Sequence, residues 1–514
     1  MDMEQDQQPV IAFLARDAQR IETAAAHVFL RGDTAYKLKK AIKLPYLDYS
    51  TLAQRKSNLD REFEINRKEA PQLYRGVRPI VRGAAGALRI GGEGEIVDWV
   101  LEMQRFPDRS LLSDVVEDGG FNDELALDLA EAVAGAHRRA RVSDWDPVSI
   151  MAALEEQLLK AFESQPGTFP AEDFGRFASL YVDRFRRLKP VLVARGKAGL
   201  VRHCHGDLHC GNIVVIEGKP LLFDAIEFSE RIATTDVLYD LAFLLMDLLR
   251  RGERRGANFI LNRYFDLRRK EETPGAAATL PLFLATRAGV RALVAADRSK
   301  ELKGKAADAA RREAADYFYR AIGHLTPEAP RLIAVGGLSG TGKTVLARAI
   351  CAEIPPQPGA FHIRSDIERK RLYRRKETEP LPPDAYAPDV SAEVYDIMLE
   401  RAGDALSAEW PVVLDAVFAK TNEREMAKAA AARHDVAFVG LWLEARADEM
   451  KSRVSARRGD ASDANAAVVD KQLGYDLGVI DWHRIDASGT PEETYERAMR
   501  VMLSSMASTS SSVL

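Results

Sequence analysis

Residues 331–350 read RLIAVGGLSGTGKTVLARAI, an apolar run, a glycine-rich turn and a helical pattern in direct succession. The turn, GLSGTGKT at 337–344, matches GxxxxGK[ST] in full, with a strand-like segment before it and a helix-like segment after it. Such a turn curls the backbone so that successive N–H groups face a phosphate. The stretch therefore predicts a phosphate-binding loop in a parallel α/β domain.

The small and polar residues of the turn have separate predicted roles. The loop itself is formed by Gly337, Gly340, Thr341 and Gly342. Lys343 would reach the terminal phosphates of a nucleotide, and the hydroxyl of Thr344 would bind Mg²⁺. The alternative is a glycine-rich turn without a ligand, which the strand-like and helix-like flanks disfavour.

Beyond the turn, apolar runs alternate with amphipathic helices, which predicts a parallel sheet wrapped by helices. HIRSDIERKRL at 362–372 places Asp366 and Arg369 on one helical face. The carboxylate would accept a proton from an attacking hydroxyl, and the arginine would grip an anionic substrate; a surface ion pair is the alternative. Asp415, at the end of PVVLD, is the candidate for orienting Mg²⁺.

Arg453 and Arg457 lie one helical turn apart in DEMKSRVSARRGDASDA at 448–464. In a mobile lid they would close over the phosphates, whereas a solvated basic face is equally compatible with the pattern. Residues 331–503 resemble the P-loop small-molecule and polynucleotide kinases, which include zeta-type toxins and chloramphenicol phosphotransferase. The resemblance rests on GLSGTGKT, on DIER as a DxxR substrate motif and on this lid. It implies phosphoryl transfer from ATP or GTP to a hydroxyl. The acceptor is not implied by the resemblance, and a small molecule or RNA is the expected class.

The N-terminal half contains HCHGDLHCGN at 203–212, which holds two of the chain's three cysteines. His203, His205 and Asp207 come close to the HxHxD start of a zinc site, but Leu208 interrupts that pattern, and the next histidine after 209 is His324. The competing template is a kinase catalytic loop, H-x-D followed by asparagine five residues after the aspartate. His205, Asp207 and Asn212 fit this spacing.

A kinase constellation needs further residues, and the sequence offers them in the required order. Asp207 would accept a proton from a substrate hydroxyl, while Asn212 and Asp224 would hold Mg²⁺ against the nucleotide phosphates. Lys37, on the strand-like TAYKLKK, would bind the α- and β-phosphates and pair with Glu62 of the following predicted helix. Glu64 is the rival partner, because the sequence leaves the phase of that helix open.

Residues 1–325 resemble the aminoglycoside phosphotransferase and choline kinase family, through HGDLHCGN, LFDAIEF and TDVLYDLAFLL. The order of the two regions resembles a bacterial family described as bifunctional aminoglycoside phosphotransferase-like and ATP-binding proteins, over nearly the full chain. The resemblance implies two ATP-binding phosphotransferase sites with Mg²⁺. TAAAHVF at 23–29 stands where a GxGxxG loop is expected, which favours an alternative in which one region is a regulatory nucleotide sensor.

The predicted fold class follows: an α+β, protein-kinase-like bilobal domain at 1–325, a P-loop α/β domain at 331–503, and a disordered tail at 504–514. The boundary lies in GHLTPEAPR at 323–331, where two prolines break the helical pattern. A net charge of −4 argues against a general nucleic-acid or membrane surface. Three cysteines favour a reducing cytoplasm, and the apolar run LAFLLMDLL is too short to span a membrane.

Overall fold

The computed structural model describes residues 7–44, 47–84, 86–456 and 461–510. The chain forms two compact units. Unit 1 holds Met1–Ser164, Lys189–Arg251 and Thr286–Val290, and unit 2 holds Gln165–Leu188, Gly252–Ala285 and Arg291–Leu514. Helical segments that precede residue 325 in the sequence therefore belong to the same compact unit as the glycine-rich turn.

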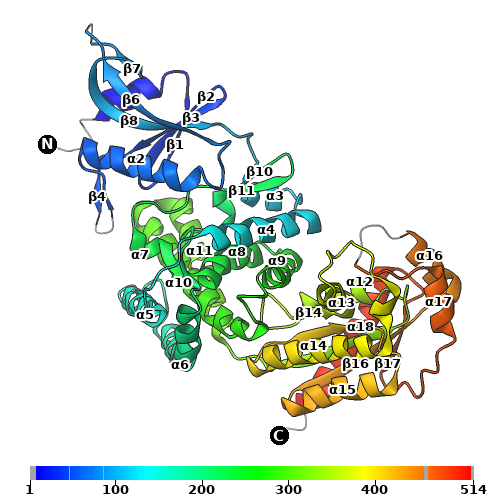
Figure 1. Cartoon of the computed structure of the whole chain (residues 1–514). Helices are drawn as coiled ribbons and strands as arrows, with labels where there is room; N and C mark the ends of the chain where they lie inside the picture. Colours follow the sequence, from blue (N-terminus) through cyan, green and yellow to red (C-terminus); the bar gives the residue numbers. More distant parts are fainter. Residues whose placement is uncertain (1–6, 45–46, 85, 457–460, 511–514) are drawn as a thin grey trace. The chain divides into compact units, whose positions relative to one another are not determined.

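A six-stranded antiparallel sheet opens unit 1, in the order β1-β2-β3-β8-β6-β7 (Figure 1). α2 (Leu52–Asn66) packs on β6 and β8, and it begins at a capping box formed by Thr51 and Gln54. The predicted strands AHVFLRG and TAYKLKK are confirmed as β2 and β3. The elements of this sheet region are α1 (Gln8–Leu14), β1 (Gln19–Glu22), β2 (Ala26–Arg31), β3 (Thr34–Lys39), β4 (Lys43–Leu44), β5 (Leu47–Asp48), β6 (Tyr74–Arg82), β7 (Leu88–Ile90) and β8 (Glu95–Gln104).

The rest of unit 1 is mainly helical, with two short antiparallel strand pairs, β9 with β12 and β10 with β11. The HCHGDLHCGN segment leaves β9 and enters β10, so paired strands fix it at both ends. These elements are α3 (Leu112–Glu117), α4 (Asp123–Arg139), α5 (Pro147–Glu163), β9 (Val201–His203), η2 (Cys210–Asn212), β10 (Ile213–Ile216), β11 (Lys219–Leu222), α7 (Glu230–Ala233), β12 (Thr234–Asp236) and α8 (Val237–Arg250). α6 (Ala171–Lys197) and α10 (Leu280–Glu301) have residues in both units.

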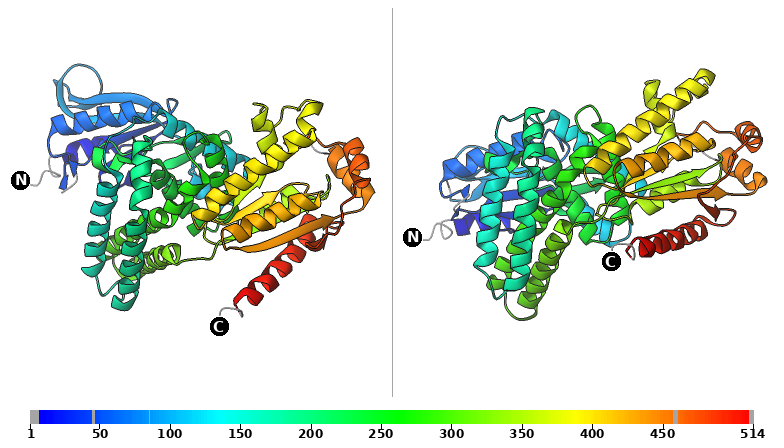
Figure 2. Two further views of the ribbon diagram at one scale, coloured as in Figure 1. Left: turned by 60° about the horizontal axis from the view of Figure 1, so that its bottom comes forward. Right: turned by 90° about the horizontal axis from the view of Figure 1, so that it is seen from below.

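Unit 2 contains a five-stranded parallel sheet in the order β14-β15-β13-β16-β17. α12 and α18 cover one face and α14 and α15 the other (Figure 2). Burial on both faces explains why these strands read as continuous apolar runs. The elements are β13 (Arg331–Gly337), α12 (Lys343–Cys351), β14 (Phe361–Arg364), α13 (Ser365–Leu372), η4 (Pro383–Tyr386), α14 (Pro388–Ser407), β15 (Val412–Asp415), α15 (Thr421–Arg433), β16 (Ala437–Glu444), α16 (Ala447–Ala456), α17 (Ala466–Leu473), β17 (His483–Asp486) and α18 (Pro491–Ser510).

Helices from before the glycine-rich turn complete unit 2. α9 (Arg254–Leu267) packs on α12, and η3 (Pro274–Thr279) packs on α14. α11 (Gly304–Leu325) leads to the loop before β13. The segment Pro274–Glu301 is long and apolar enough to cross a membrane, but 72% of its most apolar window is buried within the protein, as in the core helix of a globular protein.

The predicted fold classes are confirmed: an antiparallel sheet joined to a helical region in the N-terminal half, and a parallel α/β sheet with a P-loop in the C-terminal half. A capping box begins α18: the Glu493 amide donates to the Thr490 hydroxyl at 3.2 Å, and the Thr490 amide donates to Glu493 Oε2 at 3.3 Å. α18 extends to Ser510, past the position where a tail was expected to begin, and 511–514 lie outside the described residues.

Candidate active sites

A buried carboxylate braces the loop that follows β9. Asp240 of α8 is fully buried and accepts hydrogen bonds from the Gly206 amide at 2.8 Å and from the His205 amide at 3.3 Å. His137 Nε2 lies 3.1 Å from the same carboxylate. Gly206 has a φ of +82°, and a Cβ there would lie 3.2 Å from the Cα of Ala233. The turn before Asp207 therefore has one conformation, set by glycine and by Asp240.

Asp207 and Asn212 lie on this loop and are hydrogen-bonded to each other. The Asn212 amide nitrogen donates to the backbone oxygen and to Oδ2 of Asp207, both at 2.9 Å. Burial raises the pKa of Asp207, but the hydrogen bond and charge of His209 outweigh it, so that the pKa lies below its ordinary value. The Asp207 side chain keeps 40% of its surface exposed. An ionised carboxylate thus faces solvent from a fixed loop.

Lys37 joins the sheet to this loop. Its Nζ lies 2.6 Å from Glu62 Oε1 and 2.5 Å from Asp224 Oδ1. Burial lowers the pKa of Lys37, but Asp224 and Glu62 together raise it well above its ordinary value. Glu62 is the partner on α2, whereas Glu64 is exposed and pairs with Arg67 at 2.9 Å. The structure therefore brings the predicted Lys37, Glu62 and Asp224 together and identifies which glutamate faces the lysine.

Three further residues of this cluster, Lys39, Tyr49 and Glu227, were missed by sequence reasoning. Lys39 Nζ lies 2.5 Å from Glu62 Oε2 and 2.5 Å from Glu227 Oε1. Tyr49 donates to the same oxygen of Glu227 at 2.9 Å. Glu62 is thus held by two lysines. The available signal was the second lysine of TAYKLKK, which lies on the same face of the strand as Lys37.

The zinc alternative has no support in this loop. His205 Nε2 lies 2.9 Å from the Phe223 carbonyl oxygen, and its Nδ1 accepts from the Asp207 amide at 3.3 Å, so backbone groups occupy both ring nitrogens. Burial raises the pKa of the Cys204 thiol and that of the Cys210 thiol well above the ordinary value of a cysteine. Both thiols therefore stay protonated. Within the described ranges, the cluster with metal-ligand spacing is His137, Cys204 and Asp240, where Asp240 is already bonded to the loop.

The turn between β1 and β2 contains no glycine and is held by hydrogen bonds between Thr23 and Ala26. The Thr23 amide donates to the Ala26 carbonyl oxygen at 2.9 Å, and the Thr23 hydroxyl donates to the same oxygen at 3.0 Å. These bonds use donors that a glycine-rich loop would leave for a phosphate. The missing GxGxxG pattern at 23–29 is therefore accompanied by a backbone turn that differs from a glycine-rich phosphate loop.

The second site lies at the carboxyl end of the parallel sheet. Asp415 ends β15, and its Oδ2 accepts from the Thr344 hydroxyl at 2.7 Å and lies 3.2 Å from His362 Nε2. Burial raises the pKa of Asp415, but His362, Arg364 and Lys343 together hold it below its ordinary value. Lys343 Nζ donates to the Leu338 carbonyl oxygen at 2.9 Å across the loop. Thr344 and Asp415, 71 residues apart, are brought into contact as predicted for a shared metal.

Glycine is required at two positions of the loop. A Cβ on Gly340 would lie 2.5 Å from the Met450 carbonyl oxygen, and one on Gly337 would lie 2.6 Å from that of Leu443. Both residues have positive φ, +85° for Gly340 and +139° for Gly337. The Thr341 hydroxyl closes the turn by donating to the Leu338 carbonyl oxygen at 2.8 Å.

Asp366 and Arg369 both lie on α13, but in different surroundings. Burial raises the pKa of Asp366, against the opposing charges of Arg364 and Lys343. Arg369 is buried; it donates to the Ala385 carbonyl oxygen at 2.6 Å and stacks over the ring of Tyr386 at 5.0 Å. Arg369 therefore fastens the 383–391 segment to α13.

The arginines of the predicted lid are placed only in part. Arg453 donates to the backbone oxygens of Ala487 at 2.9 Å and Gly489 at 3.0 Å, in the loop after β17. Arg457 lies outside the described residues. Arg453 thus stabilises a loop at the sheet end, and its contacts do not include the glycine-rich turn.

Asp463 was also missed by sequence reasoning. It accepts from Lys370 Nζ at 2.6 Å, from the Tyr386 hydroxyl at 2.8 Å and from the Leu381 amide at 3.0 Å. Lys370 is almost fully buried. The signal was the second aspartate of DASDA, directly after the lid arginines. It links the lid segment to the helix that carries Asp366.

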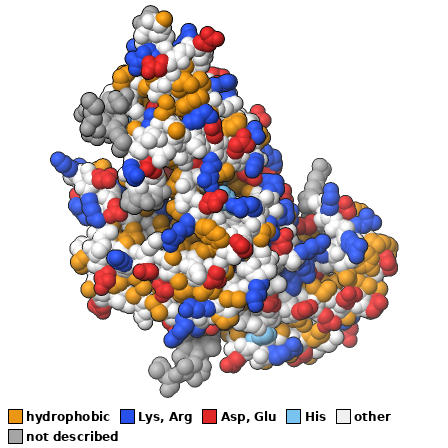
Figure 3. Space-filling view, turned by 60° about the vertical axis from the view of Figure 1, so that its left-hand side comes forward, with side chains coloured by type: hydrophobic (Ala, Val, Ile, Leu, Met, Phe, Trp, Pro, Cys, Tyr) orange, Lys and Arg blue, Asp and Glu red, His pale blue; other side chains and the backbone are white. Residues whose placement is uncertain are grey.

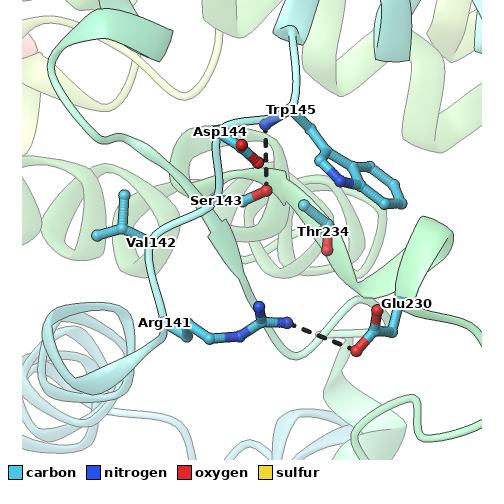
Figure 4. A pocket seen from close by; sticks show the side chains of 7 residues that line it. All are labelled: Arg141, Val142, Ser143, Asp144, Trp145, Glu230 and Thr234. Atoms are coloured by element: carbon cyan, nitrogen blue, oxygen red, sulfur yellow. Dashed lines mark hydrogen bonds and ion pairs between the residues drawn. The ribbon is translucent and has the colours of Figure 1, made fainter.

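Two cavities lie beside the first site. The larger, of about 500 Å³, is lined by His203, His205, Leu208 and the ends of α2 and α4. The smaller, of about 330 Å³, is lined by Arg141–Trp145, Glu230 and Thr234 (Figure 4). Arg141 and Glu230, 3.5 Å apart, line both cavities. Asp207 and Asp224 are not among the residues that line either cavity.

Comparison with known proteins covers both regions. The uncharacterized protein Rv2004c of Mycobacterium tuberculosis (strain ATCC 25618 / H37Rv) is 31% identical over 499 residues, 94% of this chain and 95% of that protein. The chain belongs to the same family. Within it, a family model described as an AAA domain matches residues 332–475. The match confirms the predicted P-loop domain in the C-terminal half of the chain.

Solved structures resemble separate parts of this family member. A choline/ethanolamine kinase family protein from Mesorhizobium loti covers 63% of this chain and 97% of its own, at 16% identity and a TM-score of 0.35. A sugar kinase from Janibacter sp. HTCC2649 covers 34% of this chain and 94% of its own, at 21% identity and a TM-score of 0.26.

Proposed function

We propose that the protein is a cytoplasmic ATP-dependent phosphotransferase with two sites, each of which transfers a γ-phosphoryl group to a hydroxyl acceptor. One observation carries the proposal: in each site, a residue suited to the phosphates or their metal contacts a carboxylate distant in sequence. These contacts are Lys37 to Asp224 at 2.5 Å and Thr344 to Asp415 at 2.7 Å. GTP is the alternative nucleotide for either site.

In the first site, Asp207 is the residue placed for the acceptor. The acceptor oxygen would form a bond to the γ-phosphorus as the bond from that phosphorus to the β,γ-bridging oxygen breaks, and ADP would leave. The hydroxyl proton would pass to the Asp207 carboxylate. Lys37 would offset charge on the α- and β-phosphates, with Glu62 fixing its position.

The donor atoms suit magnesium at both sites. The first site offers the Asp224 carboxylate and the side-chain oxygen of Asn212, whose orientation is set by the amide nitrogen's bond to Asp207. The second offers the Thr344 hydroxyl and the Asp415 carboxylate. Oxygen ligands are those that Mg²⁺ prefers. When bound, the ion would neutralise charge on the phosphates.

In the second site, Asp366 would receive the acceptor proton. Its raised pKa makes it a better base than an exposed aspartate. Lys343 would bind the terminal phosphates, together with the backbone of Gly340, Thr341 and Gly342. Arg369 would act through the 383–391 segment that it holds, beside the space for the acceptor.

The acceptor is proposed by class only. A small molecule fits both sites, and RNA is a further class for the second. Basic and acidic side chains are interspersed over the face shown in Figure 3, and the net charge is −4. Such a surface favours a small acceptor, since a nucleic-acid surface gathers Lys and Arg on one face.

Single-site variants test the two-site proposal. The protein would be incubated with γ-labelled ATP and a fractionated cell extract, and label followed into RNA, metabolites and protein. Asp207→Ala and Lys343→Ala should each remove a different labelled product, and the double variant should remove both. If Asp207→Ala leaves every product unchanged while Lys343→Ala abolishes all of them, the two-site proposal fails.

A second candidate function is favoured by the closed Thr23–Ala25 turn. With the Thr23 amide and hydroxyl bonded to the Ala26 carbonyl oxygen, the first site would bind nucleotide as a regulatory sensor and transfer nothing. The discriminating measurement is turnover of the Lys343→Ala variant. Residual transfer that is lost on adding Asp207→Ala indicates a second enzyme site, whereas nucleotide binding without any transfer indicates a sensor.

A further inference from the structure

α9 covers the free edge of the parallel sheet in unit 2. β14 is an edge strand, so the Ala360 carbonyl and the His362 amide point away from β15. The Asn258 side chain donates to the Ala360 oxygen at 3.0 Å, and the Asn262 side-chain oxygen accepts from the His362 amide at 2.8 Å. Two asparagines one helical turn apart therefore pair with the edge as a neighbouring strand would.

Apolar contacts support the same attachment. Phe265 meets Phe361 of β14 edge to face, with ring centroids 5.0 Å apart. The Arg348 guanidinium of α12 lies 4.6 Å from the ring centroid of Phe259. Asn258 and Phe265 are almost fully buried. α9 is thus part of the core of unit 2, although it precedes the matched residues 332–475 by some distance in the sequence.

The end of α9 also holds the helix that carries Asp366. Glu368 of α13 is buried and forms ion pairs with Arg269, Arg371 and Arg401. Asp266 lies 2.8 Å from Arg371 Nη2 and 3.4 Å from Arg401 Nη2. Ion pairs between two acidic residues and three arginines therefore connect the end of α9 with α13 and α14.

The two sides of α13 have different partners. Glu368 and Arg371, three residues apart, contact the end of α9, while Lys370 contacts Asp463 and Arg369 contacts the 383–391 segment. α13 has eight residues, so a shift of its outer side also moves Asp366. Displacement of a reacting group by about 1 Å can reduce a rate on the order of 100-fold.

We infer that the segment 254–269 contributes to the second site. Asp266 and Arg269 are positioning residues, which hold Asp366 in the orientation that it needs to contact the acceptor. This rests on the proposed phosphotransferase function of that site. The elements that recognise phosphate lie in the matched 332–475 region, and the element that orients the acceptor side comes from outside it. Acceptor geometry in this protein is therefore set partly by residues that precede the matched region.

The test uses the full chain with Asp207→Ala, so that turnover belongs to the second site. The probe is γ-labelled MgATP with water as the acceptor, and released phosphate gives kcat and KM. Asp266→Asn should lower kcat by about tenfold or more with KM for ATP changed less than about twofold, since phosphate contacts are retained. Asp266→Glu should recover most of kcat. Arg254→Ala is the matched control, because Arg254 is on the same helix and pairs with exposed Glu353, away from α13.

Amide hydrogen exchange of 365–372 and the melting temperature accompany the kinetics. Faster exchange in this peptide at a melting temperature equal to the control supports positioning. If Asp266→Asn does not fold, Arg269→Gln removes the contact to Glu368 and takes its place. A kcat within twofold of the control overturns the inference. If Lys343→Ala retains phosphate release, the proposed function of the site fails instead, whatever the result for Asp266.

Discussion

At the scale of the residue, ion pairs connect Lys37, Lys39, Glu62, Asp224 and Glu227 in one cluster. Two lysines and three carboxylates alternate within 2.5–2.6 Å contacts, and Glu62 is fully buried between the lysines. A buried charge that loses its partner is strongly destabilising. The residues that hold the nucleotide lysine therefore also stabilise the fold.

Glu62→Ala and Glu64→Ala separate these effects on one helix. Glu62→Ala should lower the free energy of unfolding by about 3 kcal/mol and abolish first-site turnover, because Lys37 and Lys39 lose a shared buried partner. Glu64 is exposed and pairs only with its neighbour Arg67, so Glu64→Ala should change stability by less than about 0.5 kcal/mol. Urea unfolding and turnover in the Lys343→Ala background measure both; equal effects of the two substitutions would contradict the assignment.

His27 gives a pH dependence. Burial, and then the charge of Arg20, lower its pKa from 6.5 to about 4. Between these values the unfolded chain binds the proton and the folded chain does not, so the stability from this group is present above pH 6.5 and is lost as the pH falls toward 4. His27→Leu should flatten the profile of melting temperature between pH 7 and 4. Parallel profiles for the two proteins would show that His27 does not contribute.

Several candidate residues of the first site could be predicted from their spacing in the sequence. His205, Asp207, Asn212 and Asp224 follow a fixed order along the chain. The first three lie on one loop, and Phe223, next to Asp224, is bonded to His205 and Asn212. The choice between Glu62 and Glu64 needed the phase of α2, which a single sequence leaves open. Asp463 and Glu227 were not predicted, because each acts through partners 77 or more residues away.

At the scale of the element, the glycine-rich turn packs closely on the backbone of α16. The Cβ-free face of Gly340 lies against the Met450 backbone, whereas a Cβ on Gly342 would have no atom within 4 Å. Both have positive φ, +85° and +93°. The two glycines therefore serve different purposes, close approach at Gly340 and backbone conformation at Gly342.

Gly340→Ala and Gly342→Ala test this difference. Gly342→Ala should cost about 1–2 kcal/mol from the left-handed conformation alone. Gly340→Ala adds a backbone clash, so it should be more destabilising and should weaken binding of a fluorescent ATP analogue by about tenfold or more relative to Gly342→Ala. Thermal unfolding and a binding titration compare the two; equal losses would mean that contact with α16 is unimportant.

Elements were predictable where periodicity decided them. The parallel sheet follows from apolar runs between amphipathic helices, β2 and β3 follow from alternation, and α2 follows from its helical pattern of apolar residues. Arg369 and Arg453 show the limit of that reasoning. Their spacing indicated anion binding, but the structure places both against backbone oxygens, a choice made by tertiary contacts that local sequence does not encode.

At the scale of the whole molecule, the division at 323–331 inferred from two prolines is not a division between compact units. Segments 165–188, 252–285 and 291–325 precede that loop and pack within unit 2. Prolines mark a break in local structure, whereas the attachment of α9 to β14 depends on asparagines about 100 residues away. Such contacts have no local signature in the chain.

Two fragments test whether α9 belongs to the folding unit of the P-loop sheet. Fragment 331–514 lacks α9 and η3, which exposes the β14 edge and removes the burial of Phe265. Loss of two hydrogen bonds and one buried aromatic side chain corresponds to about 3–5 kcal/mol. Fragment 252–514 keeps these contacts, so it should melt at a higher temperature and remain soluble where 331–514 aggregates through the open edge. Equal melting temperatures and equal amide exchange in 360–364 would show that the sheet is complete without the helix.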